Sequence, residues 1–247
     1  MKRSIQSLLL LVVLSSCSNE LHFENKAFSK KSTILCKQNC SEIKVAIPLA
    51  KSNSVAADSI NKKVFSIVKE LVYLEDQPLV KEDYEVLVSS FIQSFETTKE
   101  AFPDTTFGWE ANIEGTIKYQ SENLINIEID HYTFTGGAHG YEGIQSLLFD
   151  PKTGKTIPND NLFKNTAELK KMVETKFRTK YQIPLKGNIN QTGYLFEDDT
   201  FQLSKNILFT NEGLLFHYNQ YEAAAYVEGP KTVFIPYASL KKYLILN

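Results

Sequence analysis

Residues 107–120 read FGWEANIEGTIKYQ, and large apolar side chains alternate there with polar or small ones. This period of two predicts a strand with one buried and one solvated face, which is typical of antiparallel sheets. After a polar turn, residues 124–135 return as a second strand with Ile125, Ile127 and Ile129 on one face. At 130–134 the large apolar side chains change parity. That change predicts either a bulge or a strand end covered on both faces.

The segments on either side of this strand pair predict an α+β fold. Its antiparallel sheets would consist of hairpin-connected strands packed with helices, because the strands come in runs rather than alternating singly with helices. A capping box at Asn165-Thr-Ala-Glu168 would start one helix, and Gly154 would supply the positive φ of a tight turn. The other expected elements are a short strand at 43–47, helices over 60–71 and 84–95, a third strand at 145–149, a hairpin over 207–218, a strand at 232–235 and a short terminal helix.

The first seventeen residues, MKRSIQSLLLLVVLSSC, have the pattern of a bacterial lipoprotein signal. A basic start precedes the apolar run from Leu8 to Leu14, which is too short to span a bilayer. We predict that residues 1–16 form a signal peptide that is removed and that Cys17 carries the lipid. Cys17 would then anchor the protein to the lipid bilayer of the cell envelope, on the periplasmic face or in the outer membrane. The alternative is an ordinary secretory signal with a chance cysteine.

Composition and cysteine spacing bound the remaining possibilities. The 247-residue chain has a formal net charge of −2 and no basic block, which argues against a nucleic-acid partner. Residues 17–41 are polar and mixed, and they predict a tether. Cys36 and Cys40 within it predict a small disulfide loop, because paired thiols outside the cytoplasm tend to oxidise. A metal or redox role is the alternative, although redox pairs have two intervening residues and zinc would need further ligands. No cofactor and no metal are expected.

The motifs of metallohydrolases, serine hydrolases and phosphate-binding loops are absent from the sequence. The one unusual cluster is DHYTFTGGAHGYE at 130–142. As a ligand loop, its glycines would let the backbone approach a partner. Its candidate contacts are Tyr132, Thr135, Gly136, Gly137, His139 and Tyr141. The sequence alone favours the architectural interpretation, in which the glycines permit a sharp crossing between strands and His139 satisfies buried backbone groups.

Two further histidines have simple interpretations. His131 is expected to be a strand-end core or rim residue. His217 alternates to the face opposite Phe216 and Tyr218, which favours a solvent-facing position.

Three ordered motifs resemble one known family. Tyr132-Thr-Phe-Thr-Gly-Gly-Ala-His-Gly140 is similar to the glycine–histidine motif of extracytoplasmic domains in RsiV-type anti-sigma factors, and of the region beside the catalytic domain in PdaC-type peptidoglycan deacetylases. The turn at 149–155 fits the same family, as does the ending at 221–230 with its continuation over 233–240. The resemblance implies two α/β halves. They would be a PdaC-like half over 42–140 and an RsiV-like half over 141–247.

The resemblance also implies a function. In that family the domain acts outside the cell, and the anti-sigma members sense lysozyme by binding it. The metal motif of the deacetylase domain is absent, so deacetylase activity is not expected here. We therefore expect a lipid-anchored, non-catalytic binding module of the bacterial cell envelope, for a cell-wall glycan or a wall-directed protein such as lysozyme. The alternative is an envelope hydrolase in which His139 works with Asp130 or Glu142 as an acid–base pair. A structural or assembly lipoprotein is a third reading.

Overall fold

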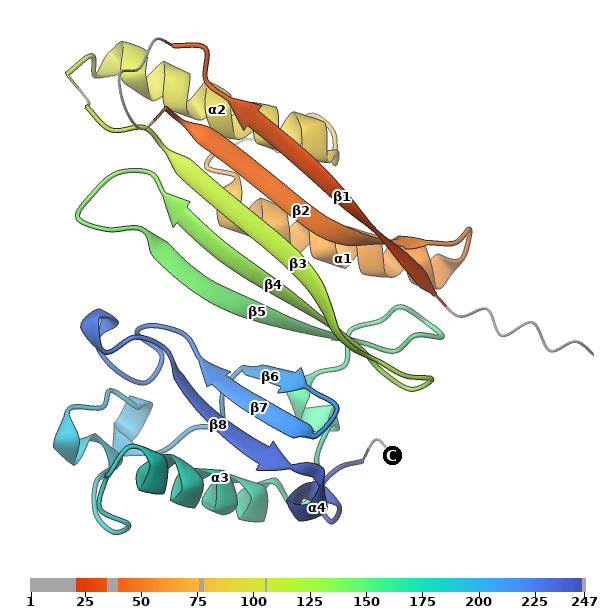
Figure 1. The fold of residues 1–247 in the computed structure, drawn as a ribbon, viewed down its shortest axis with the longest axis vertical. Coiled ribbons are helices and arrows are strands. Elements are labelled where there is room, and N and C mark those ends of the chain that lie inside the picture. Colours follow the sequence, from red (N-terminus) through yellow and green to blue (C-terminus); the bar gives the residue numbers. More distant parts are fainter. Residues whose placement is uncertain (1–20, 35–39, 76–77, 105, 246–247) are drawn as a thin grey trace, which may run out of the picture.

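The computed structural model describes residues 21–34, 40–75, 78–104 and 106–245. It has a five-stranded sheet with two helices and a smaller three-stranded sheet with its own helices (Figure 1). The predicted α+β class is therefore confirmed. The first set of elements is β1 (His22–Lys31), β2 (Glu42–Lys51), α1 (Val55–Val72), α2 (Tyr84–Ala101), β3 (Glu110–Gln120), β4 (Ile125–Phe134) and β5 (Tyr141–Phe149).

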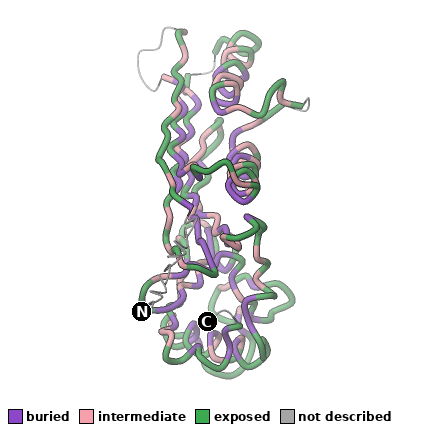
Figure 2. The backbone as a smooth tube through the Cα atoms, turned by 90° about the vertical axis from the view of Figure 1, so that its right-hand side faces the viewer, coloured by how far each residue is buried: buried purple, intermediate pink, exposed green. Residues whose placement is uncertain are grey.

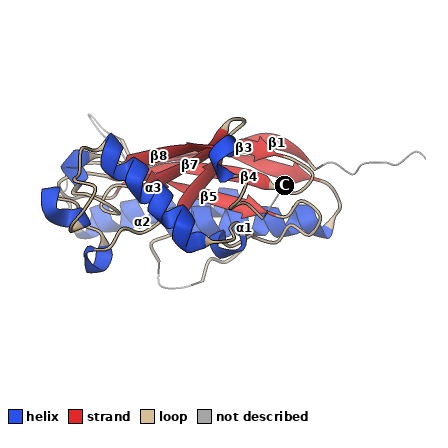
Figure 3. Ribbon diagram, turned by 90° about the horizontal axis from the view of Figure 1, so that it is seen from below, coloured by secondary structure: helices blue, strands red, loops and turns tan. Residues whose placement is uncertain are grey.

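The larger sheet has the strand order β1-β2-β3-β4-β5. All its pairings are antiparallel except β2 with β3, which run parallel because α1 and α2 form the crossover between them. Both helices lie on the same side of the strands (Figure 3). Ser54 caps α1 by accepting from the Ala57 N–H, and Asp83 caps α2 by accepting from the N–H groups of Glu85 and Val86.

The core of this half lies between the helices and the sheet, where the buried segments face one another (Figure 2). It is mostly aliphatic. Ile43, Val45 and Ile129 from the sheet meet Ile60 and Val64 from α1, and all five are buried. The helical periodicity and the strand alternation in the sequence thus correspond to one buried layer.

The segment expected to be a tether differs from the prediction. Residues His22–Lys31 form β1, which pairs with β2 along its whole length. An edge strand buries little, and only Phe23 and Phe28 of β1 pack partly against the core, so its sequence lacks a clear alternation. Cys40 is disulfide-bonded. Its predicted partner Cys36 lies outside the described residues, as do Cys17 and the predicted signal peptide.

The second half is built around an aromatic core. Its regular elements are α3 (Thr166–Lys180), β6 (Asn206–Phe209), β7 (Gly213–Tyr218), β8 (Lys231–Pro236) and α4 (Tyr237–Leu240), with the 3₁₀ turns η1 (Asn159–Asn161), η2 (Ile189–Thr192), η3 (Glu197–Asp199) and η4 (Tyr226–Glu228). Phe177 of α3 is fully buried at its centre, within 5.5 Å of the ring centroids of five other aromatic residues. Among the described residues no helix is long and apolar enough to cross a membrane.

Two local predictions need correction. Asn165 precedes α3 in the left-handed conformation (φ 55°, ψ 45°), and its side chain makes no capping hydrogen bond, so the capping box is not formed. The break between the halves also moves, because β5 completes the first sheet although residues 141–149 were expected in the second half. The turn after β5 is as predicted: Gly154 has a φ of 68°, and a Cβ there would meet the Ala56 backbone.

The two sheets meet in a seam of hydrogen bonds between β4–β5 and the second half. The Asn126 Oδ1 accepts from the Phe209 N–H at 2.9 Å, and the Asn206 Oδ1 accepts from the Ser146 N–H at 2.9 Å. Asn219 bonds both backbone groups of Ile144, each at 2.9 Å. These asparagine side chains stand in for the backbone of a further strand, so the seam fixes how the halves align.

Candidate functional site

The glycine-rich loop, residues 135–140, joins β4 to β5 at one end of the larger sheet (Figure 1). Two of its three glycines, Gly136 and Gly140, are required by close packing on aromatic rings. Gly136 has a φ of 117°, and a Cβ there would come within 2.9 Å of the Phe107 ring. A Cβ on Gly140 would lie 2.4 Å from the Tyr132 ring. The loop is therefore seated on the side chains of Phe107 and Tyr132.

His139 joins this loop to the second half. Its exposed ring stacks on Tyr226, with centroids 4.0 Å apart and an interplanar angle of 22°. Its Nδ1 lies 2.8 Å from the carbonyl oxygen of Gly140. Tyr226 in turn contacts Tyr221, at 5.6 Å between centroids. The Tyr226 hydroxyl also donates to the Gly140 carbonyl at 3.4 Å. Two motifs far apart in the sequence, 132–140 and 221–230, therefore meet through a ring stack and a hydrogen bond.

The carboxylates proposed for an acid–base pair have other neighbours. Glu142 accepts a hydrogen bond from the Gln220 Nε2 at 2.8 Å. Asp130 acts electrostatically on His131 and His217, and within the described part of the chain no hydrogen bond or ion pair joins His139 to either carboxylate. The geometry suits His139 for stacking and hydrogen bonding more than for proton transfer.

A cavity of about 370 Å³ opens beneath the loop. Phe107, Trp109, Tyr132 and Phe134 supply aromatic walls, and Glu110 supplies a carboxylate. The rings of Phe107 and Phe134 meet edge to face at 5.6 Å. Burial, with a smaller contribution from Glu110, raises the pKa of Tyr132, so its hydroxyl stays protonated and can donate. His139 and the disulfide-bonded Cys40 complete part of the rim.

A smaller polar pocket, about 130 Å³, lies beside the seam. Asp130, Glu142, His217 and Gln220 line it. Burial lowers the pKa of His217 against the opposing effects of Asn219 and Asp130. His217 was expected to face solvent, but it is half-buried in this pocket because the second sheet packs β7 toward the first.

The candidate residues are thus divided between two surroundings. Tyr132 and His139 line the aromatic cavity, whereas Thr135 and Gly137 are exposed on the loop and Tyr141 is exposed against the His131 ring at 5.5 Å. Sequence reasoning missed the cavity residues Phe107, Trp109, Glu110 and Phe134, and the stacking partner Tyr226. Phe107 and Trp109 had the signal of a buried strand face, and only their position beside the glycine-rich loop distinguishes them.

The uncovered face of the larger sheet is acidic. In the strand register, Glu114 lies opposite Asp130, and Glu142 lies opposite Tyr132. The carboxylates on this face belong to Glu42, Glu110, Glu114, Glu128, Asp130 and Glu142, against the lysines Lys31, Lys44 and Lys118. Two of these lysines are engaged, Lys44 with Glu42 at 2.9 Å and Lys118 with Glu128 at 3.3 Å. The face therefore carries an excess of negative charge beside the aromatic cavity.

Comparison with known proteins supports the resemblance found in the motifs. Residues 34–142 match the family model described as deacetylase PdaC, and residues 160–238 match the model described as a protein of unknown function, DUF3298. A DUF3298 family member from Bacteroides fragilis has a similar structure, with a TM-score of 0.67, 17% identity and coverage of 91% of this chain and 93% of that chain. A DUF3298 protein from Pseudomonas aeruginosa PAO1 gives a TM-score of 0.65, 17% identity, and coverage of 91% and 94%.

No curated protein matches the chain. At 17% identity the two solved structures establish the fold alone. The PdaC model covers the first half through the glycine-rich loop to the start of β5, and the DUF3298 model lies within the second half. The two matches agree with the resemblance that the three motifs carry, to the PdaC-type and DUF3298 domains of extracytoplasmic envelope proteins.

Proposed function

We propose that this protein is a lipid-anchored binding module of the bacterial cell envelope, and that it binds a cell-wall glycan in the aromatic cavity beneath the glycine-rich loop. The observation that carries this proposal is the combination of ring faces from Phe107, Tyr132 and Phe134 with the carboxylate of Glu110 in one cavity of about 370 Å³. A sugar ring presents C–H faces that pack on aromatic rings and hydroxyls that donate to a carboxylate.

The position of the cavity relative to the predicted anchor supports this function. The Leu21 carbonyl accepts a hydrogen bond from the Gln120 side chain at 2.9 Å, so the described chain begins beside the β3–β4 hairpin. β4 starts at that hairpin and ends at Phe134, and ten residues of strand extend for roughly 30 Å. A lipid on Cys17 would therefore hold the hairpin end near the membrane. The aromatic cavity would face away from the membrane, toward the wall.

A wall-directed protein such as lysozyme is a second candidate ligand, and the acidic sheet face favours it. A cationic protein would meet the carboxylates of Glu114, Asp130 and Glu142 across an uncovered surface. Such an interface would weaken steeply with added salt, whereas stacking of a neutral sugar on aromatic rings would not.

Calorimetric titration of residues 18–247, which keep every described element, tests the proposal. Solubilised wall fragments and lysozyme are titrated separately. We expect saturable heat with the fragments, weakened by Phe107→Ala. The matched control is Phe234→Ala, because these two rings are 38% and 42% exposed and Phe234 lies on β8 away from the cavity. Melting curves of both variants separate lost affinity from lost stability.

The outcomes distinguish the two ligands. Heat with lysozyme alone, decreasing with salt and with Glu114→Gln, would identify the protein ligand and reject the glycan. Absence of heat with both ligands would contradict the binding function. Equal affinities of the Phe107→Ala and Phe234→Ala variants for the fragments would remove the cavity as the binding site.

A further inference from the structure

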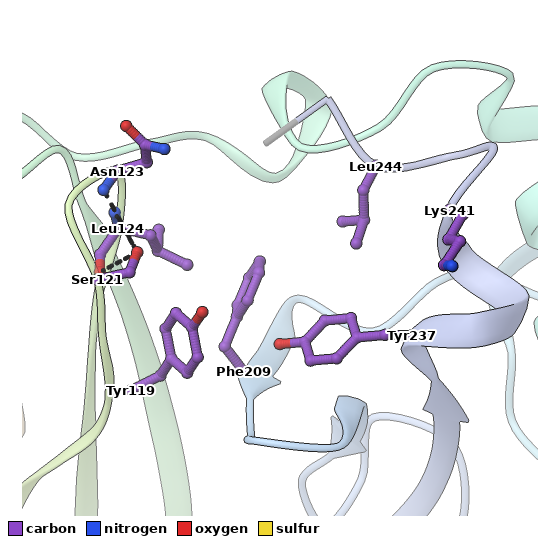
Figure 4. A pocket seen from close by; sticks show the side chains of 8 residues that line it. All are labelled: Tyr119, Ser121, Asn123, Leu124, Phe209, Tyr237, Lys241 and Leu244. Carbon is purple, nitrogen blue, oxygen red and sulfur yellow. Dashed lines mark hydrogen bonds between the residues drawn. The ribbon is translucent and has the colours of Figure 1, made fainter. Parts of the chain in front are cut away.

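A second cavity lies at the opposite end of the larger sheet from the glycine-rich loop. It has a volume of about 450 Å³ and sits between the β3–β4 hairpin, β6 and α4 (Figure 4). The residues that line it and carry the argument are Tyr119, Asn123, Leu124, Phe209, Tyr237 and Lys241. It shares no lining residue with the aromatic cavity, so it is a separate site.

The walls of this cavity are apolar because a bulge in β3 turns one ring toward the second half. The register of β3 with β4 shifts between Ile117 and Tyr119. This shift places Tyr119 on the face that meets the second sheet, where its ring lies 5.8 Å from that of Phe209. Leu124 is buried on another side. The side chains in Figure 4 surround an open volume rather than filling it.

The hydroxyl of Tyr237 is part of the cavity wall and is not available to a ligand at the mouth. It donates to the Thr210 carbonyl at 2.9 Å, which satisfies it within the fold. Burial, with a smaller contribution from Tyr119, raises the pKa of Tyr237 to about 12, so the ring stays neutral and this side of the cavity carries no charge.

The mouth of the cavity carries the ammonium group of Lys241. Lys241 is exposed, and in the described part of the chain its ammonium group makes no ion pair or hydrogen bond. The neighbouring Lys242 instead lies 3.6 Å from Glu168. The Tyr119 hydroxyl also has no hydrogen bond among the described residues. An apolar interior with a free cation and a hydroxyl at its edge matches a ligand with an apolar chain and an acidic head.

We propose that this cavity binds an acyl chain that carries an anionic head, with the chain against Leu124 and Phe209 and the head at Lys241. The hairpin that forms one wall is also where the described chain begins, at Leu21. Cys17 stands four residues earlier, a span of at most about 14 Å. The presentation of membrane lipid to the cavity rests on the proposed lipid anchor, whereas the binding chemistry does not.

Residues 18–247 are titrated with sodium myristate below its micelle concentration, by calorimetry. We expect saturable binding. Asn123→Trp, a plug at the exposed edge of the cavity, should abolish it, whereas Glu122→Trp on the same turn should not, because Glu122 does not line the cavity. Lys241→Ala should weaken binding roughly two- to fivefold, the effect of losing one exposed ion pair, and Lys242→Ala should leave it unchanged.

Vesicle flotation identifies the source of the acyl chain. Vesicles of phosphatidylcholine, with and without phosphatidylglycerol, are mixed with the same protein and with the Asn123→Trp variant. Flotation with the anionic vesicles that Asn123→Trp removes supports a membrane lipid. Myristate binding without flotation supports a free fatty acid.

Three results would overturn parts of the proposal. Absence of myristate binding, or binding that Asn123→Trp leaves intact, rejects the cavity as an acyl site. Equal affinity of the Lys241→Ala variant rejects the anionic head. Mass analysis of Cys17 in the exported protein tests the anchor independently. An unmodified Cys17 together with myristate binding would refute the lipid anchor and leave this site standing.

Discussion

The two faces of the five-stranded sheet are built in opposite ways. The face under α1 and α2 is closed and aliphatic, with Val45, Ile113 and Ile129 fully or almost fully buried. The other face is polar. Part of it docks the second half through Asn126, part lines the pocket with Asp130, and the rest is open. One face thus supplies most of the hydrophobic stabilisation, and the other supplies alignment and binding surface.

The seam aligns the two halves through directional hydrogen bonds more than through buried apolar area. Asn126 is fully buried, and its amide serves three partners: the Phe209 N–H, the Ser146 hydroxyl and the Leu147 carbonyl. The last two partners lie on β5 and hold the amide in place, and the Phe209 N–H bond crosses the seam. Apolar contacts alone would tolerate sliding of the halves, whereas the hydrogen bond from Phe209 is lost on a shift of about one ångström. The comparison therefore predicts that substitutions on the two faces destabilise the protein for different reasons. On the helix-covered face they leave a cavity, and at the seam they leave a buried polar group without its partner.

The largest effect is expected on the helix-covered face. Ile129→Ala should lower the free energy of unfolding by about 2–5 kcal/mol, because it removes a fully buried side chain and leaves a cavity. Urea denaturation followed by circular dichroism measures this loss. Thr116→Ala on the exposed face of the same sheet is the control and should change stability by less than about 0.5 kcal/mol. Similar losses in the two variants would contradict the assignment of stability to one face.

A smaller loss is expected at the seam. Asn126→Ala leaves the buried Phe209 N–H without its acceptor, which should cost about 1–3 kcal/mol. Asn112→Ala is the matched control, because the Asn112 amide bonds only the exposed Glu110 carboxylate at 2.7 Å. Urea unfolding monitored by the single tryptophan, Trp109 in the first half, and by far-ultraviolet circular dichroism tests for coupling. Two separate transitions in wild type would refute a seam that joins the halves.

Sequence patterns correctly predicted the elements that depend mainly on neighbouring residues. The helices and the strands β3 and β4 follow from apolar periodicity, and Gly154 follows from the steric demand of its turn. β1 was missed because an edge strand needs no apolar alternation. Asn165 has the residue type of a cap, yet its backbone is left-handed there, which tertiary packing decides.

Non-local contacts explain the remaining misses. The sequence does not indicate that Asn126 accepts a hydrogen bond from Phe209, or that a bulge turns Tyr119 toward the second half. The candidate site divides in the same way. Tyr132 and His139 were found because glycine and histidine cluster unusually in sequence, and Tyr226 was recognised only as part of a motif. The stacking of His139 on Tyr226 could be found only from the structure, because the two residues are far apart in the sequence.

A pH dependence distinguishes the helix-covered face from the seam, because each region has one histidine with a lowered pKa. Burial lowers the pKa of His131, on the strand face under the helices, and of His217, in the pocket at the seam. The unfolded chain therefore binds more protons than the folded chain below about pH 6.5, so stability should fall as the pH drops through that value toward the folded-state pKa. The raised pKa of Glu222, also caused by burial, opposes this trend.

Unfolding free energies measured between pH 5 and 8 test this expectation, with His131→Gln and His217→Gln as separate variants. Each substitution should flatten the pH profile of the unfolding free energy by the share that the replaced histidine contributes. A profile that both variants leave unchanged would show that neither histidine is linked to folding.

The smallest effect on stability is expected at His139, where the two halves touch through one exposed stack. His139→Ala removes the ring on Tyr226 and the contact of Nδ1 with the Gly140 carbonyl, so the unfolding free energy should fall by about 0.5 kcal/mol. Affinity for wall fragments should fall more, because the ring also lines the aromatic cavity. Tyr226→Ala is the partner variant in a double-mutant cycle measured by both melting and titration.

The cycle separates the two interpretations of the glycine–histidine motif. If the stack serves binding, each variant weakens wall-fragment affinity while the melting temperature stays nearly constant. If the stack is architectural, both variants lower the melting temperature, their effects couple strongly, and affinity falls only as far as folding does. The first outcome would assign binding to the end of the sheet distant from the predicted anchor. The second would make His139 part of the junction, alongside Asn126, and would restrict the binding surface to the rings of Phe107, Tyr132 and Phe134.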